Sequence, residues 1–104
     1  MTPQVFQILL SLAEGPRHGY AIIADVRDRT VGEMQLTAST LYDALARLAD
    51  HALIAVAPVP SDATSADARR RYYELTSQGR HAAEQESRRL ERLLAMAREK
   101  RFLA

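Results

Sequence analysis

The sequence contains no cysteine and no tryptophan, and it has only four glycines and four prolines. Without cysteine, a disulfide framework and a thiolate metal site are both excluded. No apolar run is long enough to cross a bilayer and no secretory signal precedes the first helix, so we expect a cytoplasmic protein without a membrane partner. The net charge is only +1, so any contact with nucleic acid depends on where the charges lie.

The chain has 104 residues, of which 47% are hydrophobic and 26% are charged. These values are typical of one globular domain, or of a small domain with an appended helix. The sequence has no phosphate-binding loop, no nucleophile elbow and no paired acid cluster in a recognisable setting. His51 and His81 lack companions at metal-ligand spacing. We therefore expect neither an enzyme nor a cofactor.

Helical periodicity dominates the first half of the chain. The first helix has Thr2 as its N-cap and is stopped by Gly15 and Pro16. The second spans about residues 18–29. The third begins after the N-cap Thr37, and its inward positions are Leu41, Ala44, Leu45 and Leu48.

The pattern changes to that of strands at Ile54. The stretch "IAVAPV" alternates and its prolines confine it to a short or edge strand, whereas "PSDATSADAR" has the composition of a loop. The stretch "RRRYYELTSQGR" then predicts the second strand of a hairpin. A period of two places Tyr73 in the packed face and Tyr72 in the outward face, beside Arg70. Thr76 is the expected N-cap of a final helix longer than twenty residues.

Three helices, a hairpin and a further helix follow one another in the order of a winged helix domain, a variant of the helix-turn-helix. The expected fold class is therefore mainly α with a small β-hairpin (α+β). We expect residues 1–78 to form a winged helix DNA-binding domain and residues 79–104 to form a C-terminal dimerisation helix.

Three segments resemble the signature regions of the PadR family of transcriptional regulators. They are "LLSLAEGPRHGYAI", "LTASTLYDALARLADHALI" and "RRRYYELTSQGR", which together cover about residues 8–80. The matching motifs are Pro16 with His18-Gly19-Tyr20, Thr40-Leu41-Tyr42 with Leu45, and Tyr73-x-Leu75-Thr76-x-x-Gly79. The single helix after the hairpin resembles the short branch of the family, in which such a helix forms the dimer.

The sequence departs from the family pattern at two positions. Ala52 stands where such proteins usually carry glycine, and Ala21 stands where an acidic residue is common. Glycine at position 52 would allow a positive φ at little cost, so alanine there predicts a strained turn into the wing. His18 is expected to be a structural residue at a helix start, and Tyr20 is expected in or near the core.

The start of the third helix is the predicted reader of base edges, because small hydroxyl residues and a helix N-terminus suit bases and phosphates. Alternatively, Ser39 and Thr40 only help to cap the helix. The candidate residues are Thr37, Ala38, Ser39, Thr40, Tyr42, Asp43 and Arg47.

The wing is the predicted source of phosphate contacts, because arginine has a permanent charge and a fork of donors. The alternative is an ordinary solvated charge run. The Tyr72 phenol either bonds a phosphate or covers a neighbouring side chain. The candidate residues are Arg69, Arg70, Arg71 and Tyr72.

The last helix outruns an 80-residue domain, so its distal apolar stripe needs another surface to bury. A second copy is the simplest partner, and the alternative is packing on its own domain. The stripe contains Leu90, Leu93, Leu94 and Ala97. In similar regulators the dimer interface can also form an effector pocket, whose lining here would be Leu93, Met96 and Phe102.

Together these features predict a dimeric, sequence-specific DNA-binding transcriptional regulator. We expect a repressor of a pseudo-palindromic operator on double-stranded DNA, released by a small-molecule effector. The alternative is a dimeric winged helix protein-interaction module, or anti-activator, without high-affinity DNA binding. Near-neutral net charge and the two aspartates of the third helix, Asp43 and Asp50, favour this alternative.

Overall fold

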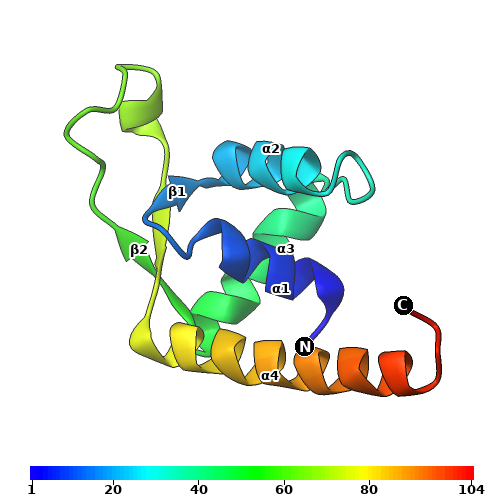
Figure 1. Ribbon diagram of the computed structural model, residues 1–104. Coiled ribbons are helices and arrows are strands. Elements are labelled where there is room, and N and C mark those ends of the chain that lie inside the picture. The colour runs from blue at the N-terminus through cyan, green and yellow to red at the C-terminus, as the bar shows by residue number, and fades with distance from the viewer.

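The computed structural model describes residues 1–104 and contains four α-helices and a three-stranded antiparallel sheet (Figure 1). The winged helix prediction is confirmed. The elements in chain order are α1 (Pro3–Ser11), β1 (Arg17–His18), α2 (Gly19–Arg29), α3 (Ala38–Asp50), β2 (Ile54–Ala57), the 3-10 helix η1 (Asp67–Arg69), β3 (Tyr72–Leu75) and α4 (Ser77–Glu99).

Threonine caps define three helix starts, as the sequence predicts. The Oγ1 atoms of Thr2, Thr37 and Thr76 accept hydrogen bonds from the third amide beyond each cap, at 3.1, 3.1 and 3.0 Å. Each bond satisfies one of the amides that a helix start leaves without a partner. The first helix ends at Ser11, a turn earlier than Gly15.

One hydrophobic core joins the first three helices to the sheet. Its innermost side chains are fully or almost fully buried, and all four inward positions predicted for α3 belong to it. The core residues are Ile8, Leu9, Leu12, Ile22, Val26, Leu36, Leu41, Ala44, Leu45, Leu48, Ile54 and Tyr73. The turn between α2 and α3 reverses direction at Gly32, which has a positive φ of 79°.

The predicted hairpin is present as the antiparallel pair β2 and β3. The sheet, in the order β1-β3-β2, has one strand more than the sequence predicts. A two-residue strand before α2 pairs with β3 on the side opposite β2, with Arg17 opposite Tyr73 and His18 opposite Tyr72. Two residues are too few to show strand periodicity, and they directly precede a helix. The segment predicted as a plain loop also contains η1.

Helix α4 has 23 residues and runs along one side of the helical layer (Figure 1). Its first turn is tied to the turn between α3 and β2, where the Thr76 hydroxyl donates to the Ala52 carbonyl at 2.6 Å. A side chain at Gly79 would collide with the Leu53 carbonyl. The distal turns extend away from the other elements, and the molecule measures 52 Å along its longest axis. None of the helices has an apolar stretch that would let it cross a bilayer.

Candidate nucleic-acid interface

The first two turns of α3 present one buried and one exposed face. The side chains of Leu41, Ala44, Leu45 and Leu48 anchor the helix in the core. All seven candidate reading residues are exposed on the opposite side: Thr37, Ala38, Ser39, Thr40, Tyr42, Asp43 and Arg47. This arrangement leaves the helix N-terminus accessible, which is the requirement for insertion in a groove.

Only part of this exposed face is engaged in capping. Thr37 is the N-cap, and its hydroxyl also donates to the Thr40 hydroxyl at 3.0 Å. Ser39 makes no hydrogen bond through its side chain within the chain, so its hydroxyl is available to a partner. The Tyr42 ring, 44% exposed, lies over Gly19, where any side chain would clash with the phenol. Tyr42 thereby couples α3 to the start of α2.

His18 is the N-cap of α2. Its Nδ1 accepts a hydrogen bond from the Ala21 amide at 3.1 Å, and its ring meets the Tyr72 ring edge-on at 5.3 Å between centroids. Burial lowers the pKa of His18; the Asp67 carboxylate opposes this effect and the Arg70 guanidinium adds to it. The structural role predicted for His18 is confirmed, with a partner that sequence cannot supply.

Tyr20 lies outside the core, contrary to the prediction. Its side chain is 56% exposed, and the Arg70 guanidinium carbon lies 4.6 Å from the centre of its ring. The first turn of α2 turns this position toward the wing, while Ile22 and Val26 take the core positions. The spacing of apolar residues along α2 could not show whether Tyr20 faces the core or the wing.

The three wing arginines have different surroundings. Arg69 and Arg71 are exposed and form no ion pair, whereas the Arg70 Nε donates to Asp67 Oδ1 at 3.0 Å. Asp67 also lies 3.7 Å from His18 Nε2. Asp67 was not among the residues expected at the site; the signal for it in the sequence is its position three residues before Arg70.

The prediction that Tyr72 is open to solvent is wrong, because the side chain is only 6% exposed. Alternation does separate Tyr72 from Tyr73, yet both faces of β3 are covered. His18 covers one edge of Tyr72. Burial, and then the nearby Asp67 and Asp62 carboxylates, raise the pKa of the Tyr72 phenol, while Arg70 opposes this effect. In this structure Tyr72 packs, so it is not a free phosphate ligand.

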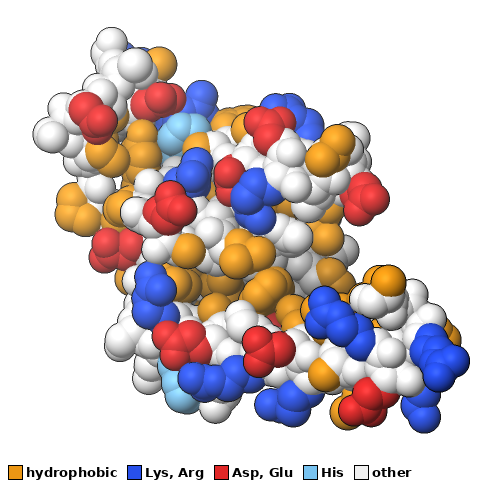
Figure 2. Space-filling view, in the orientation of Figure 1, with side chains coloured by type: hydrophobic (Ala, Val, Ile, Leu, Met, Phe, Trp, Pro, Cys, Tyr) orange, Lys and Arg blue, Asp and Glu red, His pale blue; other side chains and the backbone are white.

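The distal stripe of α4 is only partly covered within the chain. Leu90, Leu93 and Leu94 are 38, 47 and 40% exposed, while Ala97 is half-buried. Basic side chains gather at the C-terminal end of the same helix (Figure 2). Earlier in the helix, Ala83 packs against the core. Packing on its own domain thus extends from the proximal turns to Leu90, which lines a small hollow with Pro3 and Phe6 of α1.

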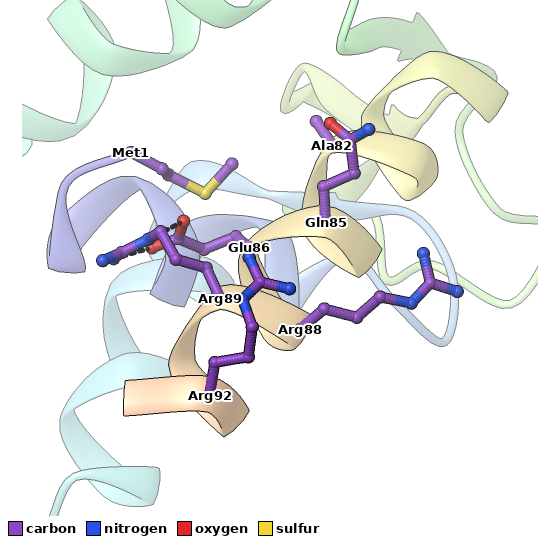
Figure 3. Close-up of a pocket in the computed structure, with 7 residues that line it drawn as sticks. All are labelled: Met1, Ala82, Gln85, Glu86, Arg88, Arg89 and Arg92. Carbon is purple, nitrogen blue, oxygen red and sulfur yellow. Dashed lines mark hydrogen bonds and ion pairs between the residues drawn. The ribbon is translucent and has the colours of Figure 1, made fainter. Parts of the chain in front are cut away.

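The largest hollow, of about 580 Å³, lies along α4 beside the N-terminus (Figure 3). Arg89 turns toward Glu86 and makes two hydrogen bonds of 2.8 and 2.6 Å, while Arg88 and Arg92 form no ion pair. These bonds lower the pKa of Glu86. The expected effector residues Leu93, Met96 and Phe102 line neither this hollow nor the two smaller ones, of about 150 and 170 Å³. The effector pocket stays a prediction.

An exposed third helix beside a wing defines the class of winged helix regulators. The sequence profile of the transcriptional regulator PadR-like family matches residues 8–85, and the chain belongs to that family.

Solved structures agree with this assignment. A transcriptional regulator of Clostridium thermocellum is 28% identical, with 97% of this chain and 90% of that chain covered and a TM-score of 0.75. A PadR family transcription regulator of Clostridium difficile is 26% identical, with 94 and 97% covered and a TM-score of 0.80. Bacillus subtilis PadR in complex with operator DNA has the same fold at 21% identity and a TM-score of 0.64, over 78% of this chain and 44% of that one. No curated protein matches the sequence.

Proposed function

We propose that this protein binds double-stranded DNA as a homodimer and represses transcription from a pseudo-palindromic operator. The observation that carries the proposal is the exposed N-terminal half of α3, held rigidly by four buried side chains on its other face. Bacillus subtilis PadR has the same fold and was solved in complex with operator DNA, which supports DNA binding by this chain.

The third helix would enter the major groove. Ser39 and Asp43 lie within its first two turns, where side chains reach base edges, and the helix N-terminus favours a phosphate. The exposed Arg69 and Arg71 of the wing would neutralise phosphates of the flanking backbone. The Thr37 hydroxyl caps α3, so we assign Thr37 the role of positioning the start of that helix.

Two copies would meet through the distal half of α4, within the proposed dimerisation segment 79–104. Exposed leucines at helical spacing form the surface that a second copy would cover. Two third helices would then occupy successive major grooves about 34 Å apart, and the dimer would block the promoter sterically. An effector pocket containing Leu93, Met96 and Phe102 would need surface from the second copy.

A second candidate function is a dimeric protein-interaction module without high-affinity DNA binding. The observation that favours it is the charge of the winged helix part: residues 1–76 contain seven basic and nine acidic side chains. Acidic side chains are visible on the wing itself (Figure 2). Residues 77–104, which are α4 and the residues after it, contain seven basic and four acidic side chains.

A salt titration of DNA binding separates the two functions. If the protein neutralises phosphates, the logarithm of its affinity falls linearly with the logarithm of salt concentration, by about 0.9 per phosphate contact. We expect a slope equivalent to at least four contacts, from Arg69 and Arg71 in each copy. Affinity that is weak and independent of salt would favour the interaction module.

A further inference from the structure

Arg70 differs from its two neighbours in how its guanidinium is held. One edge donates to Asp67, and one face lies on the Tyr20 ring at 4.6 Å. Its side chain is 37% exposed, although it lies in a surface loop. Two of the directions from which a phosphate could approach are therefore occupied within the chain.

These contacts join the wing to the start of α2. Asp67 belongs to η1 in the wing, and Tyr20 belongs to the first turn of α2. Asp67 also faces His18, the N-cap of the same helix, at 3.7 Å. The contacts thus form a bridge between two elements that are also joined by the short pairing of β1 with β3 and by the contact of the His18 and Tyr72 rings.

The bridge extends to the third helix. Gly19 follows His18, and a Cβ atom at this position would lie only 2.6 Å from the phenol oxygen of Tyr42 in α3. The orientation of the wing is therefore linked through the first turn of α2 to the helix proposed to enter the groove. A wing that turned about its base would change the angle between its exposed arginines and α3.

We propose that Arg70 is a positioning residue, which fixes the wing against α2 through Tyr20 and Asp67, and that Arg69 and Arg71 are the phosphate ligands. This inference rests on the proposed DNA-binding function. It divides a run of three identical residues into one that sets geometry and two that supply charge. Tyr20 and Asp67 become part of the DNA-binding apparatus without touching DNA.

The test compares DNA affinity and its salt slope in five proteins: the wild type, Arg70→Ala, Tyr20→Leu, the double variant of these two, and Arg71→Ala. Arg71→Ala should flatten the slope by about 0.9 for each wing. Arg70→Ala and Tyr20→Leu should each weaken binding by about 2- to 30-fold, the range of a cation–π contact, with the slope unchanged. The double variant should bind no worse than the weaker single variant, because both changes break one bridge.

The variant Asp67→Ala should change DNA affinity in opposite directions, depending on whether Asp67 only adds negative charge or holds Arg70 in place. If Asp67 only adds negative charge near DNA, its removal should raise affinity. If it holds Arg70 in place, its removal should lower affinity. The positioning role is wrong if Asp67→Ala strengthens binding, or if Arg70→Ala flattens the slope as Arg71→Ala does while Tyr20→Leu has no effect.

Amide hydrogen exchange without DNA tests the bridge separately from the proposed function. Residues 58–71 should exchange faster in Arg70→Ala and Tyr20→Leu than in the wild type, and at the wild-type rate in Arg71→Ala. If the wild type shows no salt-dependent binding while this exchange pattern appears, the proposed function fails and the bridge stands. If exchange is equal in all four proteins, the bridge does not hold the wing.

Discussion

Ala52 adopts the left-handed backbone conformation, with φ of 59°, at the turn between α3 and β2. Its carbonyl accepts the Thr76 hydroxyl, so the turn also anchors the start of α4. A Cβ atom in this conformation costs about 1–2 kcal/mol, whereas glycine adopts it freely. The strain predicted from the missing family glycine is therefore present.

Ala52→Gly should stabilise the protein by about 0.5–1 kcal/mol, because relief of this strain exceeds the added entropy of the unfolded chain. Urea unfolding measures the difference. The matched control is Ala46→Gly at an exposed interior position of α3, which should destabilise by about 1 kcal/mol. Loss of stability in both variants would show that the turn is unstrained.

His18 should make stability depend on pH. Its folded-state pKa lies below the ordinary value of 6.5, so the unfolded chain binds the proton more tightly. The stabilisation is complete above 6.5 and is lost as pH falls through the folded-state pKa. Protonation of Nδ1 also removes the acceptor for the Ala21 amide. The nearby Asp67 carboxylate favours the protonated ring, whereas the Arg70 guanidinium disfavours it.

Urea unfolding between about pH 8 and pH 5 measures this loss. His18→Asn should show a weaker dependence, because asparagine can cap the helix without titrating in this range. The same dependence in the variant would assign the effect to another group.

At the level of elements, the exposed face of α3 can be changed without altering the buried face that packs in the core. Ser39→Ala or Asp43→Ala should change discrimination at one or two operator positions by about 1–3 kcal/mol, because each removes a group in reach of base edges. Thermal unfolding should change little, since both side chains are exposed. Binding to single-base variants of the operator measures this, and unchanged preference at every position would mean that other residues read the sequence.

Helix starts could be predicted from sequence because their signals are local. A threonine cap depends on a bond to an amide three residues away, and the apolar spacing of α3 reports directly on its buried face. The two-residue strand β1 could not be predicted, because a segment of two residues is too short to show the alternation of a strand. The burial of Tyr72 could not be predicted either, since its cover comes from His18, 54 positions earlier in the chain.

The same reason explains which parts of the candidate site were found. The exposed residues of α3 follow from the period of one helix, whereas the division of labour among the wing arginines depends on Tyr20, fifty positions away. Exposure of a side chain can be inferred from its own segment. Its partner on a distant segment cannot, as the contact of Arg70 with Tyr20 illustrates.

At the scale of the whole molecule, the partly exposed apolar stripe of α4 predicts the oligomeric state. Leu90→Asp combined with Leu94→Asp should give a monomer, because each change would place an unpaired carboxylate in the interface. Sedimentation measures this. The control is Arg92→Asp combined with Ala95→Asp on the opposite face of the helix, which should remain dimeric. A double-leucine variant that stays dimeric would place the interface elsewhere.

Loss of the dimer should weaken operator binding by about 10²- to 10⁴-fold, because each half-site must then be bound separately. The part of the chain before α4 has more acidic than basic side chains, so a single copy has few charges with which to hold DNA. Operator affinity unchanged in the monomer would contradict a role for two linked copies.

Selection of bound fragments from a random DNA pool tests the central claim most directly. We expect enrichment of a two-fold symmetric motif with half-sites about one helical turn apart, and loss of that enrichment in the Leu90→Asp and Leu94→Asp double variant. Failure of the wild-type protein to enrich any motif would contradict sequence-specific DNA binding and favour the interaction module.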